Sequence, residues 1–292
     1  MFRGTYTAIV TPFRDGAIDE AAFAQLIEWQ IESGITGIVP AGTTGESATL
    51  DHDEHTRVIE LAARIARGRC RVIGGTGSNS TSEAISLTVE AEKAGADSIL
   101  LVAPYYNKPT QEGLFRHYEA IAAATKLPII LYSIPGRCGI EIAVDTVVRL
   151  ARECLNIVSI KEAGGSVERV SQLRAALPPT FTILSGDDSL TLPFMSVGAE
   201  GVISVASNII PREMVRMIQA SLDGRGAEAR EIHARFYPLF RDLFIESNPI
   251  PIKTALGLAG RISPEFRLPL CEMAPANAAK LLATLRNLNL VK

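Results

Sequence analysis

Eight short apolar segments, each followed by a segment of helical periodicity, constrain the fold more than any other feature. The apolar segments are rich in β-branched residues and alternate little, as expected for parallel strands buried on both faces. They occupy residues 6–10, 37–40, 71–74, 98–103, 129–133, 157–160, 181–184 and 201–205. The helical segments occupy residues 21–33, 54–66, 81–94, 110–124, 144–152, 167–176, 190–197 and 212–222. Eight such units predict an α/β protein with a closed (β/α)8 barrel, or TIM barrel.

An open, doubly wound sheet is the alternative architecture. Such sheets usually stop at five or six strands and carry a glycine-rich turn after the first strand. The first apolar segment here leads instead into Thr11-Pro12-Phe13. Beyond residue 224 the strand pattern stops, and residues 227–244, 251–258 and 275–288 are predicted helices. We therefore expect a catalytic barrel over residues 1–224 and a C-terminal helical region over residues 225–292.

Composition argues against several classes of protein. The net charge is −3 and both signs are scattered, so the sequence indicates no nucleic-acid surface. The N-terminus lacks the pattern of a signal peptide, and the apolar segments are too short to span a bilayer. Four cysteines at 70, 138, 154 and 271 form no C-x-x-C pair, which argues against a zinc site or a disulfide framework. We expect a soluble, cytoplasmic protein that needs no metal or other cofactor and binds neither nucleic acid nor membrane.

Lys161 directly follows the sixth apolar segment. A buried amine loses hydration, which disfavours its charged form and lowers its pKa. The neutral amine can attack a ketone and form a Schiff base. The alternative is a lysine at a strand end that extends its ammonium group to water. The barrel prediction favours the reactive amine, because active sites in such barrels lie at the C-terminal ends of the strands.

Polar residues also follow the second and fourth predicted strands. In Gly42-Thr43-Thr44-Gly45, backbone amides and hydroxyls can hold a carboxylate, or can instead form a turn and cap a helix. Tyr105 and Tyr106 can relay a proton or form a subunit contact. Their alternative role is aromatic packing under a loop.

Further polar residues follow the fifth and seventh predicted strands. Tyr132 can carry a proton, and Arg137, five residues later, can hold a carboxylate bidentately. Asp187 and Asp188 can cap the next helix or, less readily, bind a divalent metal. The strand ends thus offer an amine, a phenol, hydroxyls and a guanidinium, a set that suits imine chemistry on a small keto acid.

In these motifs and their order, the chain resembles the dihydrodipicolinate synthase family, also called 4-hydroxy-tetrahydrodipicolinate synthases, within the pyruvate-dependent class I aldolases. The resemblance runs to about residue 270. The segments that carry it are Thr5 to Pro12, Gly42 to Leu50, Pro104-Tyr105-Tyr106-Asn107, Leu131-Tyr132, Ile160-Lys161-Glu162-Ala163, Ser185-Gly186-Asp187-Asp188, Gly201 to Val205 and Asn248-Pro249-Ile250-Pro251. It implies a lyase of lysine and diaminopimelate biosynthesis that condenses pyruvate with L-aspartate 4-semialdehyde.

The resemblance also implies roles for the catalytic residues. Lys161 would form the Schiff base with pyruvate, and Tyr132 would transfer protons beside it. Thr43 would link Tyr132 to Tyr106, and Tyr106 would come from a neighbouring subunit. The family is typically a homotetramer built from two tight dimers, which accounts for a tyrosine supplied by another subunit.

The same resemblance implies residues that bind the substrates. Thr44 and backbone amides would hold the pyruvate carboxylate, and Arg137 would hold the carboxylate of the semialdehyde at the entrance. Gly186 and the main chain of Ile203 would line the pyruvate pocket. One departure is Ser133, where many members have asparagine, and it leaves the catalytic residues in place.

A second site is implied for lysine as an allosteric feedback inhibitor at the dimer interface. The matching positions are Ser47, Ala48, His52, His55, Asn79, Glu83 and Tyr105. Glu83 can pair with a ligand amine, while Asn79 and Tyr105 can bind its carboxylate. The alternative is that His52, His55 and Glu83 are ordinary polar residues at helix starts.

Two other functions remain compatible with these residues. Another pyruvate-dependent aldolase, such as N-acetylneuraminate lyase or a keto-deoxy-sugar-acid aldolase, would share Lys161 and Tyr132. Thr43, Thr44 and Arg137 favour the synthase, since an amino-acid carboxylate needs a cation where a sugar needs hydroxyl partners. A non-catalytic barrel that binds a small metabolite would keep the fold without a reactive amine.

Overall fold

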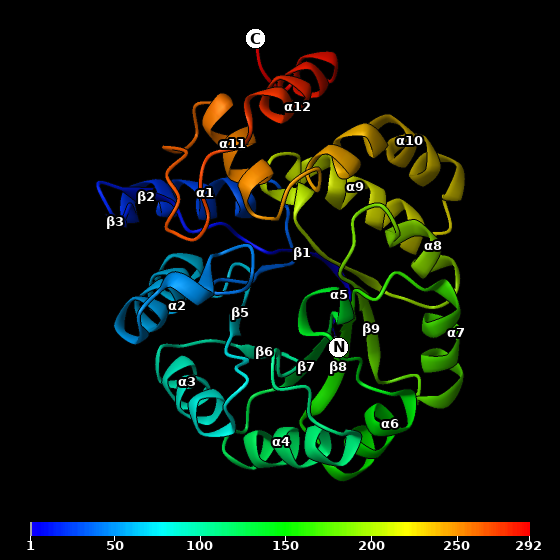
Figure 1. Ribbon diagram of the computed structural model, residues 1–292. Helices are drawn as coiled ribbons and strands as arrows, with labels where there is room; N and C mark the ends of the chain where they lie inside the picture. The colour runs from blue at the N-terminus through cyan, green and yellow to red at the C-terminus, as the bar shows by residue number, and fades with distance from the viewer. Residues whose placement is uncertain (1) are drawn as a thin grey trace.

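The chain folds into a closed barrel of eight parallel strands surrounded by helices (Figure 1). The computed structural model describes residues 2–292. The barrel strands are β1 (Gly4–Thr7), β4 (Gly37–Ile38), β5 (Arg71–Gly75), β6 (Ser98–Val102), β7 (Ile129–Ser133), β8 (Ile157–Glu162), β9 (Thr182–Ser185) and β10 (Gly201–Ser204). Each pairs with its neighbour in chain order, and β10 closes on β1. The predicted (β/α)8 barrel is confirmed, and the open doubly wound sheet was the wrong alternative.

Helices follow the strands as the periodicity predicted. They are α1 (Glu20–Glu32), α2 (His52–Ala66), α3 (Thr81–Lys93), α4 (Gln111–Ala123), α6 (Val144–Glu153), α7 (Val167–Ala176), α8 (Thr191–Ser196) and α9 (Pro211–Leu222). Side-chain caps fix several of their starts. Asp19 accepts a hydrogen bond from the Ala22 amide at the start of α1, and Asp51 forms a reciprocal capping box with Glu54 on α2.

Three local features differ from the sequence prediction. Strand β1 begins and ends earlier than residues 6–10, because residues 8–10 leave the regular ladder. A two-stranded antiparallel hairpin, β2 (Phe13–Arg14) with β3 (Ala17–Ile18), precedes α1 and was not predicted. A one-turn helix, α5 (Pro135–Cys138), directly follows β7 and carries Arg137. Short 3-10 helices, η1 (Ser47–Thr49) and η2 (Ala206–Asn208), complete the loops.

Successive strand residues point to opposite sides of the barrel wall, so the strands contribute to two apolar cores. The larger core lies between the barrel and its helices, where β-branched and aromatic side chains of both layers meet. The smaller core fills the barrel interior with Phe2, Tyr6, Ala8, Val39, Ile73, Leu100, Ile130, Tyr132, Leu184 and Ile203. Side chains therefore fill the interior, and a ligand site is expected at the C-terminal ends of the strands.

A register shift between β7 and β8 determines which residues face each other at the C-terminal end. Ile129 pairs with Ile157, but Ile130 pairs with Ser159, so one residue of β8 is bulged. Without the shift Tyr132 would lie beside Ile160; with it, Tyr132 pairs with Lys161. Bulges commonly re-aim side chains next to active sites, and this one brings the phenol and the amine together.

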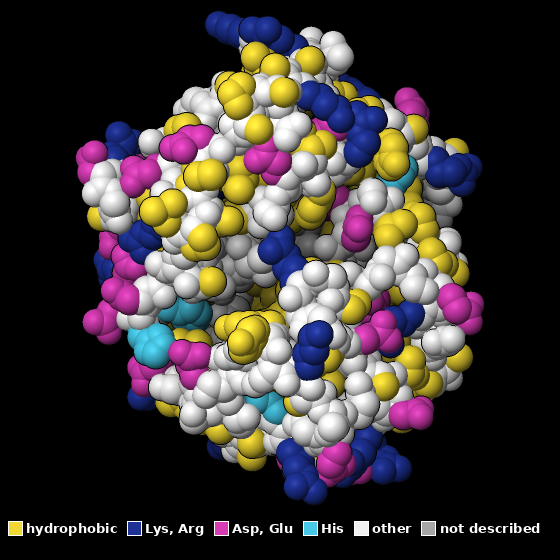
Figure 2. Space-filling view, in the orientation of Figure 1, with side chains coloured by type: hydrophobic (Ala, Val, Ile, Leu, Met, Phe, Trp, Pro, Cys, Tyr) yellow, Lys and Arg dark blue, Asp and Glu magenta, His cyan; other side chains and the backbone are white. Residues whose placement is uncertain are grey.

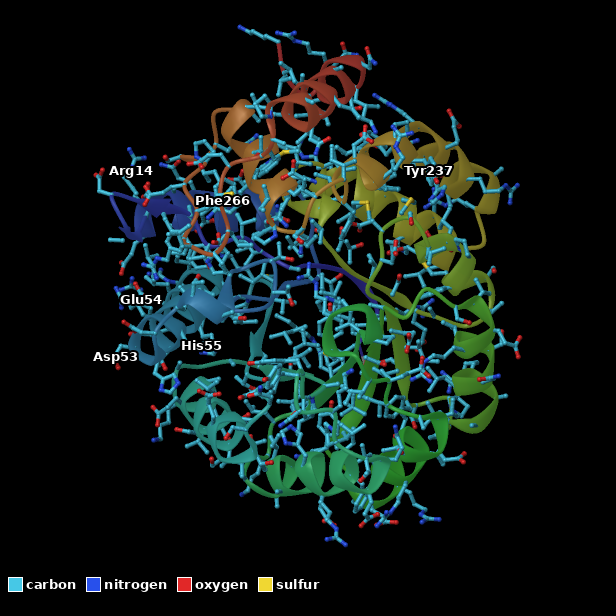
Figure 3. All side chains as sticks on the ribbon, in the orientation of Figure 1. Arg14, Asp53, Glu54, His55, Tyr237 and Phe266 are labelled. Atoms are coloured by element: carbon cyan, nitrogen blue, oxygen red, sulfur yellow. The ribbon has the colours of Figure 1, made fainter. Side chains whose placement is uncertain are left out.

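After α9 the chain forms only helices: α10 (Gly226–Asp242), α11 (Ile250–Leu258) and α12 (Pro275–Asn287). Helix α10 packs on α9, and α12 packs on both α10 and α11 (Figure 1). We propose residues 225–292 as a helical region added to a barrel of residues 1–224. The loop after α11 reaches the β2–β3 hairpin, where the Glu265 carboxylate accepts the Asp15 and Gly16 amides (Figure 3 labels the adjacent Phe266).

Candidate active site

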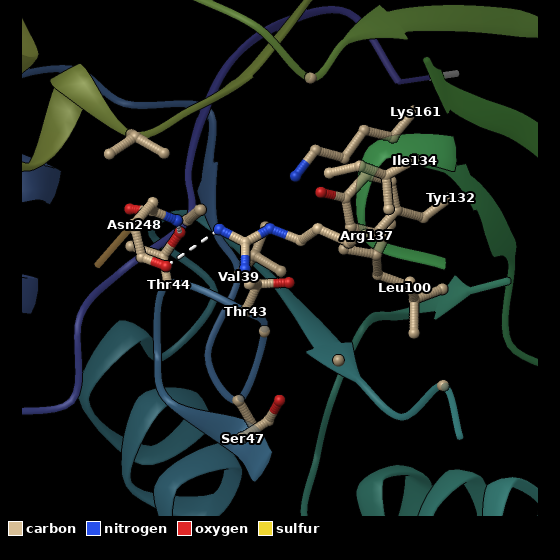
Figure 4. A pocket seen from close by; sticks show the side chains of 18 of the residues that line it. Val39, Thr43, Thr44, Ser47, Leu100, Tyr132, Ile134, Arg137, Lys161 and Asn248 are labelled. Atoms are coloured by element: carbon tan, nitrogen blue, oxygen red, sulfur yellow. Dashed lines mark hydrogen bonds between the residues drawn. The ribbon is translucent and has the colours of Figure 1, made fainter. Parts of the chain in front are cut away.

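A pocket opens at the C-terminal end of the barrel strands, where Figure 2 shows a hollow in this face. It encloses about 680 Å³ including its open mouth. Its lining comes from β-strand ends and loops of the barrel and from the segment before α11. The polar lining residues are Thr43, Thr44, Ser47, Tyr132, Arg137, Lys161 and Asn248. Figure 4 shows Lys161, Tyr132 and Arg137 on one side of the pocket and Thr44 with Asn248 on the other.

Lys161 is a buried amine inside β8, not an exposed lysine at a strand end. Only 6% of the residue is exposed, and its Nζ lies 4.1 Å from the centre of the Tyr132 ring. Burial lowers the pKa of the amine to about 7; the Asp188 carboxylate opposes this shift and the Arg137 guanidinium adds to it. A substantial neutral fraction at neutral pH makes Lys161 a competent nucleophile.

Asp188 is the buried carboxylate that acts on this amine. Its Oδ2 accepts the backbone amides of Val205 and Ala206 at 3.1 and 2.8 Å. Burial raises its pKa to about 6. The predicted cap by Asp187 or Asp188 is wrong, because the N-cap position of α8 is Leu190 and has no side-chain cap. Asp187 instead closes the turn before the helix, where its Oδ1 accepts the Ser189 and Leu190 amides.

Tyr132 is the phenol of the pocket and pairs with Lys161 in the β7–β8 ladder. Burial raises its pKa well above the usual range, while Arg137 and a hydrogen bond with the Thr43 hydroxyl act in the opposite direction. The phenol is therefore protonated at neutral pH and can donate a proton to a developing oxyanion or alkoxide.

Thr44 and Arg137 are both held by Asn248. The Asn248 amide nitrogen donates to the Thr44 hydroxyl oxygen at 3.0 Å. The Arg137 guanidinium donates from Nη2 to the Asn248 backbone carbonyl at 3.0 Å. Helix α5 presents Arg137 at the mouth of the pocket, so a guanidinium and a hydroxyl face the space beside the amine (Figure 4).

The remaining predicted residues lie at different distances from the pocket. Gly186 lines it, and a Cβ atom there would lie 2.9 Å from the Lys161 Cε, so a side chain would displace the lysine. Ile203 is buried in the barrel interior, and Val205 rather than Ile203 lines the pocket. Tyr106 is 89% exposed with a positive φ of 72°, and it does not line the pocket of its own chain.

Some of the residues predicted for a second site contact one another in pairs, namely His52 with Glu83 and Asn79 with Tyr105. Glu83 accepts a hydrogen bond from Ser78 and lies 3.0 Å from the His52 ring nitrogen. The hydrogen bond from Ser78 and, to a smaller extent, the one from His52 lower the pKa of Glu83. The Asn79 amide donates to the Tyr105 carbonyl at 3.2 Å. The buried His55 ring, labelled on α2 in Figure 3, contacts the Gly75 carbonyl at 2.8 Å, and η1 carries Ser47 and Ala48.

Sequence reasoning missed two residues of the first site. Asn248 entered only as part of a motif, and its contacts with Thr44 and Arg137 span 204 and 111 positions. For Asp188 the sequence predicts a helix cap or, less readily, a metal ligand, whereas its carboxylate accepts the Val205 and Ala206 amides and acts on the charge of the Lys161 amine. In residues 2–292 no group of three or more histidine, cysteine, aspartate or glutamate side chains is placed to hold a metal ion. No helix in this part of the chain is long and apolar enough to cross a membrane.

Comparison with known proteins gives consistent matches over the whole chain. The model of the dihydrodipicolinate synthetase family matches residues 1–288. The 4-hydroxy-tetrahydrodipicolinate synthase of Thermodesulfovibrio yellowstonii is 53% identical over 100% of both chains. The structure of that enzyme from Methylacidiphilum fumariolicum SolV is 59% identical with a TM-score of 0.98, covering 99% of this chain and 96% of the other.

A third match carries a bound ligand. The lysine-bound dihydrodipicolinate synthase of Cyanidioschyzon merolae is 44% identical with a TM-score of 0.96, and 99% of each chain is covered. The family match and these identities extend over both the barrel and the C-terminal helices.

Proposed function

The chain belongs to the dihydrodipicolinate synthetase family, and we propose that it condenses pyruvate with L-aspartate 4-semialdehyde as a 4-hydroxy-tetrahydrodipicolinate synthase. The observation that carries this proposal is the buried Lys161 amine, with its pKa lowered to about 7, beside the Tyr132 phenol in an open pocket. A non-catalytic binding barrel has no need of such an amine. The proposed pathway is lysine and diaminopimelate biosynthesis in the cytoplasm.

The proposed chemistry begins at the Lys161 amine. Its nitrogen attacks the ketone carbon of pyruvate, and loss of water leaves a protonated imine. The imine withdraws electrons, so the adjacent methyl group loses a proton and becomes a nucleophilic enamine. That carbon attacks the aldehyde carbon of the semialdehyde, and Tyr132 supplies the proton to the new alkoxide. Attack of the semialdehyde amino group on the imine carbon then closes a ring and releases Lys161.

Two groups are proposed to hold the two carboxylates. Thr44 and the neighbouring backbone amides hold pyruvate, which places its ketone beside Lys161. Arg137 holds the semialdehyde at the mouth of the pocket. Gly186 leaves the space that the Lys161 side chain needs. The guanidinium favours an amino-acid aldehyde over the sugar substrates of the related lyases, which present hydroxyl groups instead.

Replacement of Arg137 with alanine is expected to lower kcat/KM for the semialdehyde about 100-fold, because a charge-assisted hydrogen bond pair is lost. The pyruvate concentration that half-saturates borohydride trapping should change far less. Arg137→Lys keeps the charge without the bidentate fork, so its kcat/KM for the semialdehyde should lie between those of the parent and Arg137→Ala. Equal losses for both substrates would contradict the assigned role.

The residues predicted for the second site are proposed to form a regulatory lysine site. The ligand ammonium pairs with Glu83, displacing His52, and its carboxylate binds near Asn79 and Tyr105. The lysine-bound relative supports this proposal. Ser47, which is predicted for the regulatory site, also lines the active-site pocket and would connect the two sites.

Replacement of Glu83 with alanine is expected to raise the lysine concentration for half-inhibition at least about 10-fold, because the ligand ammonium loses its carboxylate partner. The rate without lysine should stay close to that of the parent. Glu90→Ala on the same helix, where Glu90 pairs only with the exposed Lys93, is the matched control. A parent enzyme that lysine does not inhibit would rule out the site.

We propose a homotetramer formed as a dimer of dimers. The exposed Tyr106 supports this assembly, because an aromatic residue held outward by a strained backbone can complete the pocket of a neighbouring copy. Tyr106 would then extend the proton path that begins at Tyr132 and Thr43. Sedimentation of the parent and of Tyr106→Phe, with kinetics on both, tests the assembly and the role of the phenol separately.

A further inference from the structure

Asn248 is a polar residue of the C-terminal region that lines the pocket. It lies in the loop between α10 and α11, only 6% of it is exposed, and it lines the same cavity as Lys161. Its neighbours in sequence are anchored, because the Lys253 ammonium on α11 donates to the Glu46 carboxylate within the Thr43–Thr44 loop. The segment that contains Asn248 is therefore joined to that loop by two contacts, Lys253 with Glu46 and Asn248 with Thr44.

The hydrogen bonds of Asn248 have a defined direction. Its amide N–H group donates to the Thr44 oxygen at 3.0 Å. Since the oxygen accepts there, the hydroxyl hydrogen of Thr44 is free to point into the pocket and donate to an anion. The Asn248 carbonyl accepts from Arg137 at 3.0 Å, which holds one edge of the guanidinium and leaves its other N–H groups for a ligand.

We infer that Asn248 is a positioning residue for both carboxylate-binding groups: its side chain orients the Thr44 hydroxyl as a donor, and its backbone carbonyl orients the Arg137 guanidinium. This inference rests on the proposed function, in which Thr44 binds the pyruvate carboxylate. It assigns a role in substrate binding to the C-terminal region, which supplies no reacting atom.

Asn248→Asp tests the side-chain part of the inference. The carboxylate has the same shape but can only accept hydrogen bonds, so the Thr44 hydroxyl turns to donate to it and presents lone pairs to pyruvate. The pyruvate concentration that gives half-maximal borohydride adduct on Lys161 should rise about 10-fold or more. Asn248→Leu removes the donor without reversing the hydroxyl, and should give a smaller increase.

Two further variants separate positioning from a merely structural role. In Thr44→Val, which has no hydroxyl to orient, adding Asn248→Asp should raise the half-saturating pyruvate concentration much less than it does in the parent. Asn156→Asp is the control, because Asn156 binds backbone carbonyls before β8, at the opposite end of the barrel. It should leave pyruvate trapping unchanged.

The outcomes distinguish this inference from the proposed function. If the parent forms the Lys161 adduct but Asn248→Asp half-saturates at the parent's pyruvate concentration, the inference is wrong and the function stands. The same conclusion follows if Asn248→Asp raises the half-saturating pyruvate concentration as much in Thr44→Val as in the parent. It also follows if Asn248→Leu raises that concentration more than Asn248→Asp does. If the parent forms no adduct, both the function and the inference fail.

Discussion

Lys161→Ala is expected to reduce the rate of condensation by at least about 10³-fold, because the covalent route through the imine disappears. Of the side chains lining the pocket, Lys161 supplies the only amine. Tyr132, Thr44 and Arg137 stay in place, so the variant should still bind pyruvate without reacting with it. The measurement is steady-state turnover of pyruvate and the semialdehyde, with the fold checked by circular dichroism.

Lys253→Ala separates the loss of the nucleophile from the loss of any buried lysine. Lys253 is also fully buried, but it is paired with Glu46 and lies outside the pocket lining. Its loss should lower stability far more than the turnover of the molecules that remain folded. A folded Lys161→Ala variant with turnover within about 10-fold of the parent would leave no role for the imine.

Lys253→Met is expected to lower the free energy of unfolding by about 3–5 kcal/mol, because the buried Glu46 carboxylate loses its cationic partner and keeps only a 3.4 Å hydrogen bond from the Arg267 amide. Both side chains are fully buried. The Lys253 ammonium also lies 4.3 Å from the centre of the Phe13 ring and 5.2 Å from that of Phe266. The pair thus connects α11 to the loop that carries Thr44. Urea denaturation of the parent and the variant measures the difference.

A second substitution tests whether the unpaired charge is the cause. Adding Glu46→Gln to Lys253→Met should recover part of the lost stability, since removal of both buried charges is often close to neutral. Lys93→Met is the surface control, because exposed pairs such as Lys93 with Glu90 contribute at most about 1 kcal/mol. If Lys253→Met unfolds at the same urea concentration as Lys93→Met, the buried pair has no such role.

The barrel could be predicted because its signal is local and repeated. Each strand is a short apolar segment, and each helix has its own periodicity, so eight units identify the architecture even where β1 and β4 are shorter than expected. The position of Lys161 follows from the same logic, since its strand number and end place it on the barrel axis. The bulge that pairs it with Tyr132 has no comparable sequence signal.

Contacts between distant parts of the chain could not be predicted in this way. Asn248 reaches Thr44 across 204 positions, and no periodicity describes that distance. The Glu46–Lys253 pair joins the loop that carries Thr44 to α11 across 207 positions. The local sequence predicts that Asp187 or Asp188 caps the next helix, whereas the partners of Asp188 are amides 17 and 18 positions away. The role of Tyr106 depends on a neighbouring copy and stays a prediction.

The measurement that tests the central claim most directly is borohydride reduction in the presence of pyruvate, followed by peptide mass spectrometry. The amine of Lys161, with its pKa of about 7, should form the imine, and reduction should leave a stable adduct on that residue alone. The reaction should be faster at pH 8 than at pH 6, because the neutral amine is the nucleophile. An adduct on another lysine, or no adduct at all, would contradict the proposed Schiff base.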